Sequence, residues 1–152
     1  MTLSDIEFEA ILADNSKQVT GDITWSDDED HSPTREFRCD ITSQTGWPLV
    51  LRGSYNPLTE NLTYVIILSG VGRIYALDIG KDHKNPDRTM VGEKHKHKWT
   101  EEHRDKEAYC PADITEPASD PVAVWGQFCD EFGVTHVGEM HEPGMVRPED
   151  FL

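Results

Sequence analysis

The sequence lacks the marks of a secreted, membrane-spanning or disulfide-stabilised protein. It has only three cysteines in 152 residues, and no two of them are close in sequence. Such a set argues against a disulfide framework or a zinc knuckle and predicts reduced thiols. No apolar run reaches the roughly 20 residues of a membrane-spanning helix, and the chain opens with an acidic amphipathic segment rather than a secretory signal. We therefore expect a cytoplasmic protein with no membrane partner.

Basic residues are scarce too. Lys and Arg number 14 against 29 Asp and Glu, so the net charge is −15, which repels nucleic acid over most of the surface. The chain also has no Gly-rich phosphate loop, no Gly-x-Ser-x-Gly and no His-Glu-x-x-His motif. Three explanations of the acidity stay open: solubility, the binding of a basic partner, or the focusing of an anionic substrate onto a local basic patch.

What the sequence does contain is one basic stretch, residues 81–106. This stretch holds eight of the 14 Lys and Arg residues and four of the seven histidines, against six acidic residues. It carries about +2 while the remainder carries about −17. Within it, residues 93–99 alternate strictly as Glu-Lys-His-Lys-His-Lys-Trp. In an extended strand, successive side chains point to opposite faces, so the lysines would lie on one face and the imidazoles on the other.

The rest of the pattern predicts an α+β fold. Ser4 and Glu7 have the spacing of a capping box at the start of an N-terminal helix, and Asp120, Pro121 and Gly133 fit the start and end of a C-terminal helix. Between the helices the apolar period is two. It predicts strands near 36–41, 49–55, 62–68, 73–79, 93–99 and 108–111.

We therefore expect an antiparallel five- to six-stranded meander sheet, covered on one face by the two terminal helices. The nearly continuous apolar run at 62–68 suits a central strand that is covered on both faces. Residues 1–137 should form a single α+β domain, and residues 138–152, with two prolines, an irregular C-terminal tail.

The imidazoles of the basic stretch suggest chemistry on phosphodiesters. His95 and His97 can act as a general acid and base on one phosphodiester, with His83 or His103 as an auxiliary. Neighbouring cations would hold the phosphate, and an exposed tryptophan would stack on unpaired bases. The expected substrate-binding residues are Lys94, Lys96, Lys98, Arg104 and Trp99.

Two other interpretations of this run stay open. The lysines also suit a solvated edge strand, in which they prevent unwanted pairing, and Trp99 also suits the core. Alternatively, His95 and His97 supply two ligands to a zinc-like ion, with a third from His83, His103, Asp78 or Asp82. Because the intervening lysines disfavour a nearby dication, we predict no metal ion and no cofactor.

A family resemblance supports the location of the site. The segments 75–79, 83–86, 92–97 and 105–108 carry a His-x-Asn-Pro motif followed by Gly-x-x-His-x-His. This pattern resembles small uncharacterised bacterial proteins, some of them similar to toxin–antitoxin or phage-defence components. The likeness covers roughly residues 73–110 and implies no particular activity. The strongly acidic remainder of the chain is a departure from what a nuclease would require.

The leading functional expectation is a small cytoplasmic protein that acts on RNA or another phosphodiester through the His/Lys-rich strand, in the manner of a toxin-like ribonuclease. The alternative is a non-enzymatic acidic protein, such as an inhibitor or antitoxin-like factor, that engages a basic partner. The sequence leaves open whether the chain is an enzyme and what its oligomeric state is.

Overall fold

The computed structural model describes residues 2–144 as two α-helices, nine strands and one short 3₁₀ helix. The helices are α1 (Asp5–Ala13) and α2 (Pro121–Phe132), and η1 (Glu29–His31) is the 3₁₀ turn. The strands are β1 (Gln18–Thr20), β2 (Ser26–Asp27), β3 (Arg35–Ile41), β4 (Leu49–Asn56), β5 (Asn61–Leu68), β6 (Gly72–Ile79), β7 (Lys94–Lys98), β8 (Ala108–Tyr109) and β9 (Thr135–Val137).

The two helices begin and end where their local signals place them. Ser4 caps α1, and Glu7 returns the hydrogen bond to complete the capping box. Asp120 caps α2, Pro121 occupies the first turn, and Gly133 ends the helix in the left-handed conformation that glycine adopts without strain. These signals act within one turn of the chain, so they do not depend on tertiary contacts.

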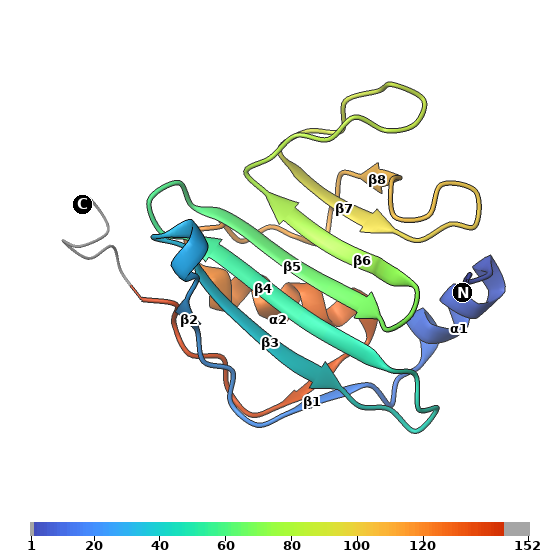
Figure 1. Ribbon diagram of the computed structural model, residues 1–152, viewed down its shortest axis with the longest axis horizontal. Coiled ribbons are helices and arrows are strands. Elements are labelled where there is room, and N and C mark those ends of the chain that lie inside the picture. The colour runs from blue at the N-terminus through green and yellow to red at the C-terminus, as the bar shows by residue number, and fades with distance from the viewer. Residues whose placement is uncertain (1, 145–152) are drawn as a thin grey trace.

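Seven strands form one meander sheet in the order β2-β3-β4-β5-β6-β7-β8 (Figure 1). Every neighbouring pair is antiparallel and consecutive in sequence. The expected α+β class is therefore confirmed. The expected five to six strands were too few, because the two-residue strand β2 extends the sheet at one edge.

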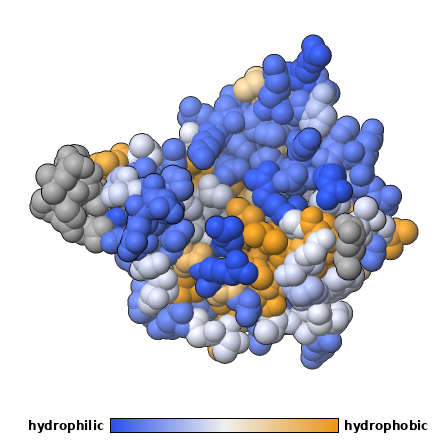
Figure 2. Space-filling model, viewed as in Figure 1, coloured by the Kyte–Doolittle hydropathy of each residue, from blue (hydrophilic) through white to orange (hydrophobic). Residues whose placement is uncertain are grey.

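One face of the sheet carries the core and the other is largely open. Helix α2 lies across the first face, as Figure 1 shows, and α1 packs beside α2 with Phe8 and Ile11 buried in the same core. Along β5 the burial alternates, so Tyr64 and Ile66 are buried while their neighbours are only half-buried. The expectation that 62–68 is covered on both faces was wrong, because α2 covers one face only. Figure 2 shows apolar surface in the middle of the exposed face.

A second, two-stranded sheet joins the ends of the described chain. In it β1 pairs in parallel with β9, and Val19 lies opposite His136. Residues 138–144 contain no helix or strand, although Met140 forms an isolated bridge with Ile23. The rest of the expected tail, 145–152, lies outside the described residues. Among the described residues no helix is long and apolar enough to cross a membrane.

Candidate functional site

Strand β7 sorts its side chains as the alternation predicts. It pairs with β6 so that His95 lies opposite Asp78 and His97 opposite Ala76. Lys96 lies opposite Leu77, on the face of the sheet that α2 covers. The imidazoles therefore project from the face opposite to α2, and the ammonium groups and imidazoles are separated by the thickness of the sheet.

The lysines are engaged in contacts on the helix side. Nζ of Lys96 is fully buried, 2.6 Å from Oδ2 of Asp113 and 3.0 Å from Oε1 of Glu131. Lys98 pairs with the other oxygen of Glu131 at 2.9 Å. Lys94 donates to the carbonyl oxygen of Ile114 at 2.7 Å. These three lysines hold β7 to α2 and to the segment after β8, and they point away from the imidazoles.

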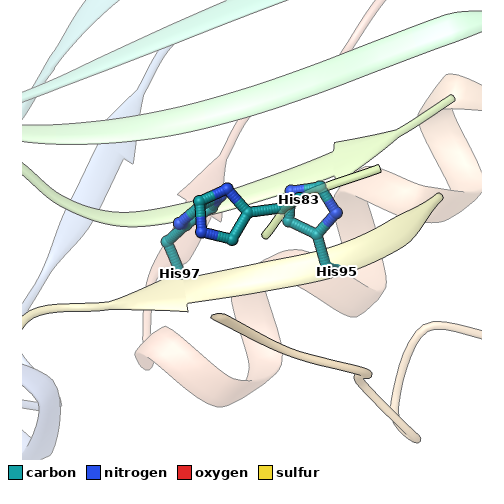
Figure 3. A group of neighbouring side chains, drawn as sticks. All are labelled: His83, His95 and His97. Carbon is teal, nitrogen blue, oxygen red and sulfur yellow. The ribbon is translucent and has the colours of Figure 1, made fainter. Parts of the chain in front are cut away.

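The two imidazoles are buried by loops rather than by a helix. His95 and His97 are each only 1% exposed. His83, from the segment between β6 and β7, lies against both of them, with ring centroids 5.5 Å from His95 and 4.6 Å from His97 (Figure 3). One ring nitrogen from each of the three histidines lies within 4.8 Å of one from each of the others. Three residues spread over 15 positions of the sequence thus form one cluster.

Each imidazole has one nitrogen fixed by a backbone carbonyl. Nδ1 of His95 lies 3.0 Å from the Gly92 oxygen, and Nδ1 of His97 lies 2.9 Å from the Asp105 oxygen. Nε2 of His83 lies 2.7 Å from the Lys106 oxygen. A carbonyl oxygen only accepts hydrogen bonds, so each of these nitrogens donates a proton. The hydrogen bonds therefore set both the tautomer and the orientation of every ring.

Asp78 adds a carboxylate to the cluster. Its Oδ2 lies 3.3 Å from Nε2 of His95 and 3.3 Å from Nε2 of His97. Its Oδ1 accepts a hydrogen bond of 2.8 Å from Oγ1 of Thr63 on the neighbouring strand. Burial alone raises the pKa of Asp78, but the hydrogen bonds from His97 and Thr63 and the nearby imidazoles outweigh it and lower the pKa to about 2.

The loop that covers the cluster is attached to β8 by the asparagine of the His-x-Asn-Pro motif. Nδ2 of Asn85 donates to the Ala108 oxygen, and Oδ1 of Asn85 accepts from the Ala108 nitrogen, both at 2.9 Å. The side chain therefore imitates a strand partner for β8. Together with the bond from His83 to the Lys106 carbonyl, this clip holds the 80–92 loop over the imidazoles.

An open groove of about 620 Å³ lies beside the cluster, between the 80–92 loop and the segment that follows β7. His83 lines the groove as well as contacting the buried rings. The other lining residues are Lys84, Pro86, Glu102, His103, Arg104 and Lys106. The lining thus carries three permanent positive charges and one negative charge, the reverse of the overall charge balance of the chain.

The remaining predicted site residues lie on the groove side of the cluster or in the core. His103 lines the groove, and its side chain is 32% exposed. Trp99 is 4% exposed, with its indole nitrogen donating to the Leu3 oxygen at 2.8 Å. The Arg104 guanidinium lies over the Trp99 ring, 4.9 Å from its centroid, so a cation–π contact with the buried tryptophan positions this cation of the groove.

Sequence reasoning missed Asn85 as an anchor and Glu131 as the partner of the lysines. Asn85 belongs to the His-x-Asn-Pro motif, but its bond to Ala108 spans 23 positions and has no local signal. Glu131 lies between the buried Phe128 and Phe132 on α2. A carboxylate next to a buried helix stripe is the signal that could have indicated a charged partner in the sheet.

Comparison with known proteins gives a family match for the chain but no activity. Residues 3–134 match the model of a family described as a family of unknown function (DUF6978). No curated protein and no solved structure matches the chain. The match agrees with the expected uncharacterised family, and it carries no link to toxin–antitoxin or defence modules.

Proposed function

Because the chain belongs to this family of unknown function, we propose its function from the site: it binds RNA or another phosphodiester in the groove beside the histidine cluster. The observation that carries the proposal is a cationic groove in a protein of net charge −15. Among the described residues, no carboxylate lies within ion-pair distance of Lys84, Arg104 or Lys106, the three permanent cations of the groove. They are therefore available to phosphate oxygens.

The acidic surface outside the groove favours binding of a polyanion in the groove. Charge of one sign repels a polyanion over most of the molecule, so a local patch of the other sign concentrates the ligand there. A cytoplasmic location, where RNA is plentiful, goes with this proposal. The proposal gives Lys94, Lys96 and Lys98 no contact with the ligand, since all three point to the α2 side.

The direct test is the binding of a labelled single-stranded RNA, followed by fluorescence anisotropy at several salt concentrations. Three phosphate contacts predict a slope of log K against log salt of about −2. Lys84→Ala, Arg104→Ala and Lys106→Ala should each weaken binding and make the slope less steep. Arg38→Ala removes the same charge from an exposed position of β3 and should leave binding unchanged. Equal effects of all four substitutions would contradict the proposal.

The finer form of the proposal is a toxin-like ribonuclease, the expectation that the histidines of the basic stretch raise. His103 is the imidazole that a ligand in the groove can reach most freely, since His95 and His97 are buried and both nitrogens of each are in close polar contacts. We expect His103→Ala to abolish cleavage of the RNA while retaining its binding. The alternative function, an acidic protein that engages a basic partner, predicts neither RNA binding nor turnover.

A further inference from the structure

The hydrogen bonds of the histidine cluster to backbone carbonyls use one nitrogen of each ring and leave the other for a different partner. With Nδ1 of His95 and His97 and Nε2 of His83 donating to carbonyls, a neutral ring has its other nitrogen unprotonated. Those nitrogens are Nε2 of His95, Nε2 of His97 and Nδ1 of His83.

The carboxylate of Asp78 makes this arrangement unfavourable on its own. Oδ2 of Asp78 lies 3.3 Å from Nε2 of His95 and from Nε2 of His97, and because Nδ1 of each ring already donates, Nε2 can donate to Asp78 only when the ring carries a second proton. In the neutral rings both of these nitrogens accept, as Oδ2 does. Acceptors that face each other in a site with little access to water repel, and the repulsion is strong because the local dielectric is low. A positive charge placed between them turns the repulsion into attraction.

We propose that His83, His95, His97 and Asp78 form a binding site for a divalent transition-metal ion of the zinc class. Imidazole nitrogens and a carboxylate oxygen are ordinary zinc ligands, and four of them complete a tetrahedral shell. The outer shell is also in place, since each imidazole donates to a carbonyl and Asp78 accepts from Thr63. Because zinc–nitrogen bonds are about 2.0–2.1 Å, the ring nitrogens, which lie within 4.8 Å of one another, move closer together when the ion binds.

The lysines of β7 do not oppose this site. The sequence led us to expect no metal ion because Lys94, Lys96 and Lys98 flank the histidines, but their ammonium groups lie on the α2 side and bind acceptors there. Arg73 is a cation near the carboxylate, with Nη1 3.9 Å from Oδ2 of Asp78, but its Nε pairs more closely with Asp105 at 2.9 Å.

The experiment uses the untagged full chain, freed of metal with a chelator and titrated with Zn²⁺ against a chromophoric competitor. We expect one equivalent of zinc per chain and a four-coordinate visible spectrum with Co²⁺ as the probe. His83→Ala should weaken zinc binding by at least the roughly 10–100-fold that outer-shell changes cost. His83 is only half-buried, so this variant keeps its fold.

Asp78→Asn is the second variant, because it keeps the shape of the side chain while removing its charge. Its amide oxygen still accepts from Thr63, and its NH₂ group donates to a bare Nε2, so the metal-free protein keeps its thermal midpoint while zinc binding weakens. His31→Ala and His103→Ala remove imidazoles outside the cluster and should bind zinc as the wild type does.

Two results would overturn the site: the absence of stoichiometric zinc uptake, or equal zinc affinity in wild type, His83→Ala and Asp78→Asn. Neither result bears on the groove. Arg104→Ala should lose RNA affinity and keep zinc, so the metal site and the proposed function fail or succeed separately.

Discussion

Nζ of Lys96 lies 3.0 Å from Oε1 of Glu131, on the opposite side of the sheet from the imidazoles. The same oxygen accepts hydrogen bonds from the hydroxyls of Tyr75 and Tyr109. Burial alone raises the pKa of Glu131, but the hydrogen bonds from these two tyrosines and from Lys98 and Lys96 lower it to about 2. This one carboxylate therefore joins β6, β7 and β8 to α2, and it stabilises the strand that carries the histidines.

Removal of that carboxylate should destabilise the fold strongly. Glu131→Ala leaves the buried Lys96 ammonium with Asp113 as its one carboxylate and leaves two tyrosine hydroxyls without their acceptor. We expect a loss of about 3–5 kcal/mol in the free energy of unfolding, measured in urea. Lys98→Ala removes a more exposed partner and should cost about 1 kcal/mol or less. Similar costs for the two substitutions would contradict the central role of Glu131.

The same group should make stability fall in acid. The pKa of Glu131 is about 2 in the folded protein against an ordinary 4.5, so between these values the unfolded chain binds more protons. Its contribution is complete above pH 4.5 and is lost as the pH falls toward 2. Urea midpoints measured across this range should fall less steeply for Glu131→Gln than for wild type. The comparison is necessary because Asp14 and Asp78, also with pKa values of about 2, titrate in the same window.

Two glycines should respond in opposite directions to substitution by alanine. Gly53 lies opposite Phe37 in the sheet, and a Cβ at Gly53 would lie 2.0 Å from Cε2 of that ring. Gly53→Ala should therefore cost about 1–3 kcal/mol through overpacking. Gly126 is exposed on α2, and a Cβ there would meet nothing within 4 Å, so Gly126→Ala should stabilise by about 0.5–1 kcal/mol. Calorimetric unfolding of both variants checks the contrast, and a destabilised Gly126→Ala would contradict it.

Loss of the Asn85 clip should loosen the cover of the histidine cluster. Asn85→Ala removes both hydrogen bonds to Ala108, so the Ala108 amide should exchange with solvent faster while the amides of β4 and β5 keep their protection. Asn85→Asp is the informative partner variant. Its carboxylate still accepts from the Ala108 nitrogen but repels the Ala108 oxygen, so its effect should be at least as large. Unchanged exchange at Ala108 in both variants would show that other contacts hold the loop.

Local patterns predicted more of this fold than of its site. The caps of α1 and α2 and the period of two in β3 to β7 depend on neighbouring residues, and the structure confirms them. The pairing of β1 with β9 joins Val19 to His136 across more than a hundred positions. Strands of three residues are too short for their apolar alternation to predict this pairing. The alternation in β7 predicted which side chains share a face. It did not predict that α2 covers one face and the 80–92 loop the other. Helix α2 is distant in sequence, and the loop is fixed by hydrogen bonds from His83 to Lys106 and from Asn85 to Ala108, each of which spans 23 positions.

The repetitive sequence of β7 places an unusual demand on its pairing with β6. A slip by one residue would exchange the two faces of β7. The ammonium groups would then lie under the loops that now cover the imidazoles, and the imidazoles would lie on the α2 side. No hydrophobic pattern opposes such a slip, since lysine and histidine alternate without an apolar residue. Polar partners therefore set the register, because Glu131 pairs with the ammonium groups on one face and Asp78 contacts the imidazoles on the other. In this strand, charged and polar partners set the register that apolar residues set in most sheets.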